Sequence, residues 1–143
     1  MRGLKVFDVV GIGTPVVDCF ATITDDFLKS RGLRKGATNF LPRAELDALE
    51  EAVKVKHVLP GDNARNVCEG ISMLNGSAAY GGCVGKDWEG RFFCQTLEML
   101  EIHSEVVFEC GRTGKILVLI TPDKERTFAV DLGNSTQYRR VAR

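Results

Sequence analysis

The first segment that could do chemistry is a glycine turn followed by a carboxylate. Residues Lys5 to Ile12 are rich in Val and Ile and predict a buried strand. Gly11 and Gly13 stand at its carboxyl end, and Asp18 follows. In open α/β sheets ligands bind at that end of the strands, where a carboxylate can accept hydrogen bonds from two neighbouring sugar hydroxyls. The same spacing also fits a carboxylate that caps a turn or pairs with a lysine.

A dinucleotide-binding loop is a competing interpretation of this segment, and its residues disfavour it. The third glycine of such a loop would stand at position 16, which is Val16. Pro15 and the two β-branched residues after it also oppose a helix that begins there. The segment therefore predicts a ligand-binding turn that is not a dinucleotide fingerprint.

A second candidate site begins at Pro60. Gly61 would let a ligand approach the backbone closely, and a helix predicted from Asn63 would present free N–H groups to it. Asn66, one turn into that helix, can both donate and accept hydrogen bonds, which suits a hydroxyl. Asp62 or Asn63 also fits a helix cap. Capping alone gives no reason for Gly61 and Asn66, so we expect a binding role as well.

Two further segments carry weaker signals. Arg126, in the predicted hairpin Thr121 to Phe128, could reach a phosphate with its guanidinium, although a surface arginine on a strand is the plainer interpretation. The glycine-rich segment Gly82 to Gly90 predicts a strand, a turn and a helix. It lacks the Gly-Lys-Ser or Gly-Lys-Thr end of a phosphate-binding Walker loop.

The cysteines and histidines show no metal-binding pattern. The five cysteines are odd in number, none forms a Cys-x-x-Cys pair, and His57 and His103 lie far apart. This pattern disfavours both a disulfide framework and a zinc site. We therefore predict no metal in this chain, and reduced cysteines in a cytoplasmic protein.

The composition excludes several classes of protein. Of the 143 residues 44% are hydrophobic, and the 19 basic and 19 acidic side chains cancel. That balance is typical of one globular domain and is too apolar for a disordered chain. A zero net charge gives no electrostatic reason to expect nucleic acid or a membrane as a partner, and no apolar run is long enough to cross a membrane. Asp8 interrupts the only apolar stretch near Met1, which disfavours a secretory signal.

Alternating strands and helices must position these candidates. Helical spacing and caps predict helices from Thr24 to about Gly32, from Pro42 to about Lys54, from Asn63 to about Gly76 and from Asp87 to about Leu100. The predicted strands cover residues 5–12, 19–24, 37–41, 56–59, 78–84, 105–109, 115–121 and 126–131. This order predicts an α/β fold with a parallel sheet, and the last strands suggest a second, smaller sheet.

Taken in order, these segments resemble the ribokinase or PfkB family of sugar and nucleoside kinases. The matching elements are Gly11-x-Gly13-x-x-x-x-Asp18, Gly61-x-Asn63-x-x-Asn66, Gly81-Gly82-Cys83-Val84-Gly85-x-Asp87-x-x-Gly90, Thr113-Gly114 and Pro122-Asp123-x-Glu125-Arg126-Thr127. Each is weak alone, but together they keep the order and spacing of the family. The resemblance runs from about Phe7 to Gly133, and the part from Thr22 to Leu41 looks most like the adenosine-kinase branch.

The resemblance implies a fold and an activity. The fold would be a partial ribokinase-like domain over residues 1–143, with a parallel sheet core, helices on both faces and a small β-sheet lid. The lid strands would lie near 18–24, 37–41 and 105–131, and the C-terminal half of the fold would be missing. The activity would be ATP-dependent transfer of a phosphoryl group to a hydroxyl of a small-molecule sugar or nucleoside, a reaction that needs positioning and charge neutralisation.

The resemblance also assigns site residues by position. Asp18 and Asn66 would bind sugar hydroxyls, and Gly61 would stand in the close-approach turn. Arg126 would lie near the phosphates. The other residues expected to line the substrate site are Thr14, Asn63, Thr38 and Phe40.

Two positions depart from the family pattern. Asp62 stands where a second glycine is usual, and it adds a negative charge beside the expected substrate. Thr14 replaces an asparagine that is common in the adenosine branch. Both differences bear on which sugar or nucleoside is bound.

The family's ATP site, its Gly-Ala-Gly-Asp anion hole and its catalytic aspartate lie in the C-terminal half, beyond this sequence. We therefore expect no catalytic residue in this chain, and we expect ATP and Mg²⁺ to serve the complete enzyme without being bound by this half alone. The core sheet would keep an exposed edge, which favours association, such as a homodimer through the lid sheet. The alternative hypothesis is a non-catalytic module that binds a sugar or nucleoside, or that only associates through its lid.

Overall fold

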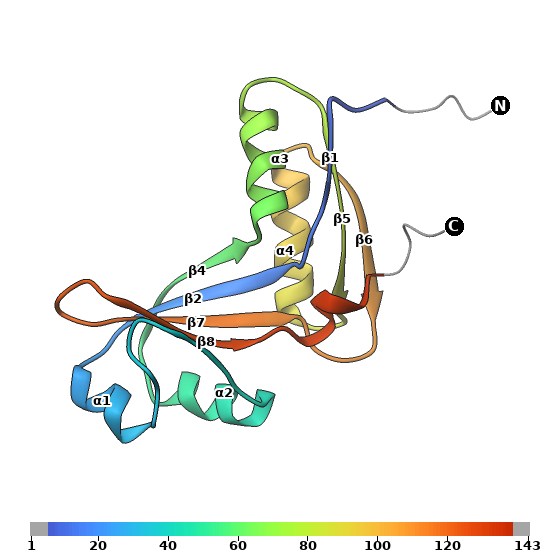
Figure 1. Cartoon of the computed structure of the whole chain (residues 1–143). Helices are drawn as coiled ribbons and strands as arrows, with labels where there is room; N and C mark the ends of the chain where they lie inside the picture. The colour runs from blue at the N-terminus through green and yellow to red at the C-terminus, as the bar shows by residue number, and fades with distance from the viewer. Residues whose placement is uncertain (1–5, 139–143) are drawn as a thin grey trace.

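Two β-sheets organise the chain (Figure 1), whose computed structural model describes residues 6–138. One sheet has three parallel strands in the order β1-β5-β6, namely β1 (Val9–Ile12), β5 (Ala78–Gly85) and β6 (His103–Glu109). The other has five strands in the order β3-β8-β7-β2-β4, namely β3 (Thr38–Phe40), β8 (Arg126–Asp131), β7 (Gly114–Ile120), β2 (Val16–Thr22) and β4 (Val55–Gly61). The predicted α/β fold, with a parallel core sheet and a second sheet, is confirmed.

Two helices bury one face of the three-stranded sheet. These are α3 (Asn63–Met73) and α4 (Trp88–Met99), drawn on the same side of β1, β5 and β6 in Figure 1. Apolar side chains of both helices and of β5 form one core with Cys68, Ala78, Tyr80, Phe93, Leu97 and Ile102. The short 3-10 helix η1 (Gly133–Gln137) also contacts β5, and Tyr138 after it lies against Gly81. Gly81 and Tyr80 point to opposite faces, so the second face is covered by this short element and not by an α-helix.

Two other helices cover one face of the five-stranded sheet. They are α1 (Asp25–Ser30) and α2 (Arg43–Glu51), both on the same side of the sheet in Figure 1. Their buried leucines pack on strand residues in a cluster of Val17, Cys19, Ala21, Leu28, Leu46, Leu49, Leu117, Leu119 and Ala129. Because side chains alternate along a strand, Asp18 on β2 and Ile116 on β7 point to the other face.

One strand lies in a different sheet from the one predicted. The lid was expected to include the whole of residues 105–131, but β6 pairs in parallel with β5 in the core sheet. The reason is the α4 crossover, because a strand that follows a helix returns parallel to the strand before that helix, as a right-handed βαβ unit. The strand predicted over residues 56–59 is longer than expected. It is β4, a seven-residue strand at the edge of the five-stranded sheet and antiparallel to β2.

Other predicted bounds shift by a few residues. The first strand begins at Val9, and Lys5, where it was expected to begin, lies outside the described residues. α2 ends at Glu51, before the predicted Lys54. The two remaining segments expected in the lid, 18–24 and 37–41, overlap β2 and β3 of the five-stranded sheet.

Polar caps begin three helices where the sequence predicts them. Thr24, Asp62 and Asp87 each accept a hydrogen bond from the backbone N–H three residues further along, at the starts of α1, α3 and α4. On α3 the apolar Val67 is 56% exposed, whereas the charged Arg65 is buried. In the part of the chain that the structure describes, no helix is long and apolar enough to span a membrane.

A buried charged network joins the core to the five-stranded sheet. The fully buried Glu89, at the start of α4, has its Oε1 atom 3.0 Å from Arg43 Nη2 on α2 and 2.9 Å from Lys115 Nζ on β7. Lys115 is itself buried and also pairs with Glu50 Oε2 at 2.7 Å. Buried charges persist only when they are paired in this way. The network therefore fixes how α4 packs against α2 and β7.

Candidate functional site

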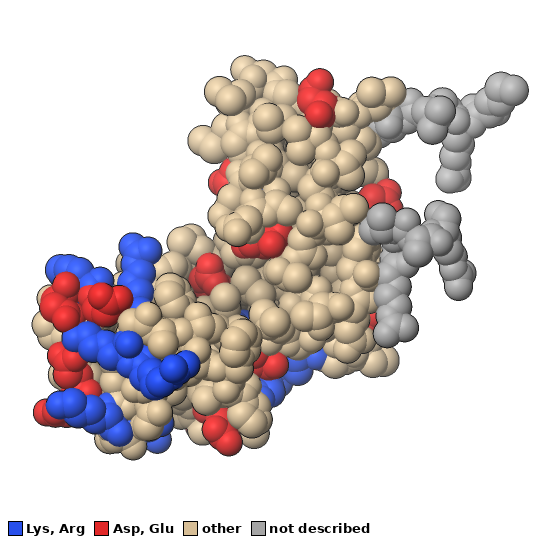
Figure 2. All heavy atoms as spheres, viewed as in Figure 1, with Lys and Arg blue, Asp and Glu red and all other residues tan. Residues whose placement is uncertain are grey.

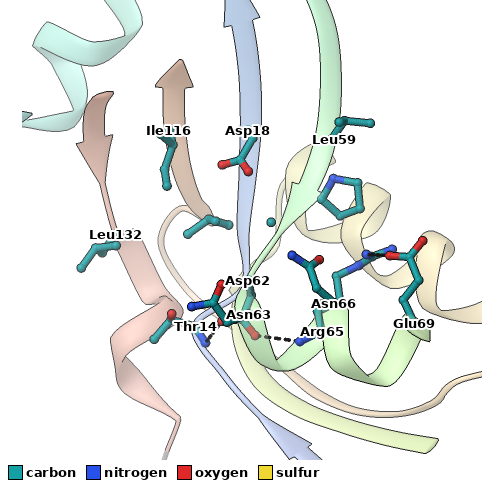
Figure 3. A pocket seen from close by; sticks show the side chains of 13 residues that line it. Thr14, Asp18, Leu59, Asp62, Asn63, Arg65, Asn66, Glu69, Ile116 and Leu132 are labelled. Atoms are coloured by element: carbon teal, nitrogen blue, oxygen red, sulfur yellow. Dashed lines mark hydrogen bonds and ion pairs between the residues drawn. The ribbon is translucent and has the colours of Figure 1, made fainter. Parts of the chain in front are cut away.

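A cavity of about 560 Å³ lies where the five-stranded sheet meets the start of α3 (Figure 3). Its walls come from the β1–β2 loop, β2, β4, β7, α3 and the residue after β8. Five of the residues predicted for the site line it, namely Thr14, Asp18, Gly61, Asn63 and Asn66. The fold thus brings both glycine segments singled out in the sequence into one cavity.

Asp18 brings a buried carboxylate to this cavity. It stands in register with Leu59 on β4 and Ile116 on β7, so the three side chains lie in one row across the sheet. Its Oδ1 atom is buried and has no hydrogen-bond partner among the described residues. Burial raises the pKa of Asp18 from its ordinary value to about 6. An unpartnered carboxylate oxygen is an acceptor for the hydroxyls of a ligand.

Gly61 makes room for that carboxylate. A Cβ atom at this position would lie 2.5 Å from Asp18 Oδ2 and 2.9 Å from Val16 Cγ2. Val16 and Gly61 are partners in the antiparallel pairing of β2 with β4. A larger residue would push into Asp18, so the glycine is needed for the approach of the two strands as well as for access to the backbone.

The side chain of Asp62 lines the cavity and is held by three donors. Its Oδ2 atom accepts hydrogen bonds from the Arg65 backbone N–H at 3.1 Å and from the Tyr80 hydroxyl at 3.0 Å. Its Oδ1 atom accepts one from the Thr14 backbone N–H at 3.3 Å. Figure 3 shows this side chain between Thr14 and the first turn of α3. Burial, together with the negative charge of Asp62, raises the pKa of the Tyr80 hydroxyl, which keeps it protonated as a donor.

Arg65 and Glu69 complete the charged lining, and the sequence pattern does not single them out. Arg65 is only 3% exposed, and its Nη1 atom lies 2.5 Å from Glu69 Oε2, one turn along α3. The Nε atom of Arg65 has no partner among the described residues, and its guanidinium lies 6.0 Å from the centre of the Phe93 ring. The i, i+4 spacing of opposite charges is visible in the sequence. It is typical of exposed helix faces, however, and only the packing shows that this pair lines a cavity.

Two predicted site residues on β3 lie outside the cavity lining. Phe40 belongs to the same cross-strand row as Asp18, but β3 is three strands from β2, about 14 Å at the usual strand spacing. Thr38 is two residues away along β3, in the row of Phe20. The structure therefore places both on the same sheet as Asp18 without bringing them to it, and their binding roles stay predictions.

Arg126 lies at the start of β8, at the end of the β7–β8 hairpin. It pairs with Ile120, which pairs with Thr22, and Thr22 is about 13 Å along β2 from Asp18. On the face seen in Figure 2, Lys and Arg side chains gather over α1 and this hairpin with Asp and Glu side chains among them, and the charges visible over α3 and α4 are acidic. A contact of Arg126 with a phosphate stays a prediction.

Comparison with known proteins decides the family. A sequence pattern described as "pfkB family carbohydrate kinase" matches residues 38–142, which is most of the chain. The chain belongs to the pfkB family of carbohydrate kinases. The resemblance stated from the sequence motifs is thereby confirmed.

Two curated pfkB relatives are named for different acceptors. The "Probable fructokinase-6, chloroplastic" of Arabidopsis thaliana is 31% identical over 117 residues, which cover 80% of this chain and 27% of that protein. The guanosine-inosine kinase of Escherichia coli is 27% identical over 141 residues, which cover 92% of this chain and 32% of that protein. This pfkB chain therefore spans about a third or less of the length of these curated relatives.

Solved structures of pfkB-type kinases share the fold. The adenosine kinase from Sinorhizobium meliloti matches with a TM-score of 0.79 and 28% identity, over 92% of this chain and 41% of its own. A probable sugar kinase from Rhizobium etli matches with a TM-score of 0.80 and 26% identity, over 92% of this chain and 40% of its own. The ribokinase-like fold expected from the resemblance is therefore confirmed for the part that this chain covers.

The starts of α3 and α4 in this pfkB chain do not fit nucleotide phosphates, and the possible metal ligands among its described residues do not gather around one point. Helix N-termini are common phosphate sites, but Asp62 caps α3 and Asp87 caps α4. Asp87 also accepts a hydrogen bond from the Thr113 backbone N–H at 2.8 Å. Within residues 6–138, no group of three or more His, Cys, Asp or Glu side chains could hold a metal. We therefore derive no reaction step through ATP or Mg²⁺ from these residues.

Proposed function

We propose that this chain is the acceptor-binding part of an ATP-dependent sugar or nucleoside kinase, and that the acceptor binds in the cavity beside Asp18. One observation carries the proposal, which is that Asp18 lines a cavity of about 560 Å³ while its buried Oδ1 atom has no hydrogen-bond partner among the described residues. A buried polar atom without a partner costs free energy, so a ligand that donates hydrogen bonds to it is favoured. The hydroxyls of a sugar ring are such donors.

The relatives support this class of ligand. A fructokinase, a guanosine-inosine kinase and an adenosine kinase are named for acceptors that share a sugar ring with free hydroxyls. The cavity lies within the range of about 300–1,000 Å³ that is usual for small-molecule sites, which admits a nucleoside as well as a simple sugar. Both a nucleoside and a simple sugar are therefore acceptors in this proposal.

The residues of the cavity would bind and orient the acceptor. Asp18 accepts hydrogen bonds from two neighbouring hydroxyls, Asn66 and Asn63 add donors and acceptors from α3, and Gly61 lets the ring approach β4. Holding the reacting hydroxyl in one orientation is a large part of what phosphoryl transfer requires. We assign the ATP site and the catalytic base to the part of the family fold that this chain does not span, and we expect no kinase activity from these residues alone.

The five-stranded sheet would act as the lid of this site. Its face that carries Asp18 is the one that α1 and α2 leave open, so a ligand bound at Asp18 would lie under it. In this proposal Thr38 and Phe40 contact the acceptor from β3, and Arg126 contacts the transferred phosphate. Because β3 lies three strands from Asp18 in the same sheet, these contacts require a ligand that extends from Asp18 across the open face toward β3 and the β7–β8 hairpin.

The test is calorimetric titration of the protein with fructose, ribose, guanosine and adenosine. We expect at least one of them to bind, and we expect binding to weaken by more than tenfold in both Asp18→Ala and Asn66→Ala. Gly70→Ala is the matched control, since a Cβ there meets no atom within 4 Å. The absence of binding by every one of these ligands would overturn the proposal.

The second candidate function is association through the lid sheet. It is favoured by the exposure of large apolar side chains at both edge strands, with Leu59 on β4 53% exposed and Phe40 on β3 69% exposed. Sedimentation equilibrium of the protein and of Phe40→Ser tests it. A dimer that the substitution dissociates would support association through the sheet, and a monomer at all concentrations would remove this candidate.

A further inference from the structure

Asp62 has a backbone conformation that residues other than glycine rarely adopt. Its φ is 149° and its ψ is 137°, a region where a Cβ atom is strained. Among the residues that the structure describes, Asn75, Glu101 and Lys124 also have positive φ, but Asp62 alone of these lines the cavity. The strained backbone conformation of Asp62 therefore stands at the wall of the cavity.

The carboxylate of Asp62 accepts hydrogen bonds from three donors at the edge of the cavity, two of which belong to the lining residues Thr14 and Arg65. These are the Thr14 N–H, the Arg65 N–H and the Tyr80 hydroxyl, all within 3.3 Å of its oxygens. A cluster of backbone N–H groups at a helix start attracts anions, and a phosphate oxygen is their usual partner. Without the Asp62 carboxylate, the Thr14 and Arg65 N–H groups would be available to an anionic ligand. In this chain they are already occupied by a fixed negative charge.

The other charged residues that line the cavity do not neutralise the negative charge of Asp62. Asp18, Asp62 and Glu69 bring three carboxylates, and Arg65 brings the one cation among the lining residues. Arg65 is held by Glu69 at 2.5 Å, so its charge is already neutralised. An acceptor that enters the cavity therefore meets negative charge at Asp18 on β2 and at Asp62 before α3. These carboxylates repel an anionic ligand and therefore disfavour its binding.

We propose that Asp62 determines the acceptor class of this site, so that it takes neutral sugars or nucleosides and excludes acceptors that already carry a phosphate. This inference rests on the proposed function and names the substrate class of the same cavity. The neutral acceptor keeps its hydrogen bonds to Asp18, because its hydroxyls are donors. A phosphorylated acceptor meets a wall whose Thr14 and Arg65 N–H donors already bind the Asp62 carboxylate.

The experiment compares each neutral ligand that binds with its monophosphate by calorimetry. The pairs are fructose with fructose 6-phosphate, ribose with ribose 5-phosphate, and guanosine and adenosine with their 5′-monophosphates. The wild type should prefer the neutral member by at least tenfold. In Asp62→Asn and Asp62→Gly this preference should fall about five- to tenfold, because the monophosphate gains affinity while the neutral ligand changes little. A purely structural role would weaken both members of a pair alike.

Asp26→Asn is the control, because it removes the same charge from a side chain that is 96% exposed on α1, and it should leave the preference unchanged. Thermal melting shows which Asp62 variant folds, and either one decides the question. Neutral ligands that bind with an unaltered preference in both variants would overturn the role of Asp62 and leave the proposed function standing. No binding of any neutral ligand by the wild type would overturn the proposed function itself.

Discussion

Gly61 and Asp18 lie on adjacent antiparallel strands, so close that a methyl group on Gly61 would come within 2.5 Å of the Asp18 carboxylate. The carboxylate is therefore positioned by strand pairing, and not by a flexible loop. Sites built on paired strands are held in one geometry before the ligand arrives. This relationship places the carboxylate for which we propose a ligand-binding role at the junction of β2 and β4.

Gly61→Ala should weaken ligand binding by at least tenfold. The added Cβ forces the Asp18 side chain to move, and its other close contact is Val16 Cγ2 at 2.9 Å. Overpacking of this kind also lowers the free energy of unfolding by about 1–3 kcal/mol. Calorimetry and denaturant unfolding measure the two effects. Gly70→Ala, with open space at its Cβ, should leave binding unchanged and stabilise α3 slightly. Equal binding by Gly61→Ala and the wild type would contradict the geometry.

Asp18→Asn should stabilise the fold while it weakens ligand binding. The pKa of Asp18 is raised by burial to about 6, above its value in the unfolded chain, so the ionised group destabilises the folded state at pH values above 6. We expect the free energy of unfolding to increase by about 1 kcal/mol at pH 7.5, after allowance for solvent screening.

The raised pKa of Asp18 also determines how the stability difference between the wild type and Asp18→Asn depends on pH. As the pH falls from 6 to 4, Asp18 becomes protonated in the folded state and its cost disappears, so the stabilities of wild type and Asp18→Asn should converge. Chemical denaturation of both proteins at pH 4.5 and 7.5 measures this. A difference that grows toward low pH would show that the pKa of Asp18 is lowered and not raised.

Ligand affinity should fall as the pH drops through 6. The ionised carboxylate is the better acceptor for hydroxyl donors, so protonation of Asp18 removes the stronger form of the hydrogen bond. We expect the dissociation constant of the bound sugar or nucleoside to rise several-fold between pH 7.5 and 5. Asp18→Asn should bind weakly at both pH values and show no such rise. If the affinity of the wild type is constant between pH 7.5 and 5, Asp18 is not the hydrogen-bond acceptor whose titration controls ligand binding.

Glu89→Gln should destabilise the protein on the order of 3 kcal/mol, although it is remote from the cavity lining. The substitution leaves Arg43 and Lys115 without the fully buried carboxylate that joins them. Asp26→Asn removes an exposed ion pair with Lys29 and should cause no measurable change. Thermal and denaturant unfolding compare the two variants. Equal stability of Glu89→Gln and the wild type would show that the network does not hold α4 against α2 and β7.

Much of the fold and the centre of the site follow from local sequence signals. Thr24, Asp62 and Asp87 cap helices as their residue types predict, because the capping interaction is local. Asp18 and Gly61 were both predicted for the site, each from a glycine turn beside a polar residue, and the structure places them in one cavity.

Long-range packing accounts for what the sequence did not reveal. The place of β6 in the core sheet depends on the path of α4, which no local pattern records. The burial of Arg65 beside Glu69 depends on how α3 packs against Phe93. Asp62 looked like a helix cap and an added charge, but its contacts with Tyr80 and Thr14 arise only where the two sheets meet.

The most direct test of the acceptor-binding account is an NMR titration of the Asp18 carboxyl carbon, assigned by its loss in Asp18→Asn, with and without saturating fructose, ribose, guanosine or adenosine. Without ligand we expect the carboxyl to titrate with a pKa of about 6. With the acceptor bound, donated hydroxyls favour the ionised form, so the pKa should fall toward the ordinary value of an aspartate. A pKa that stays the same with every neutral ligand would contradict the claim that Asp18 receives the acceptor.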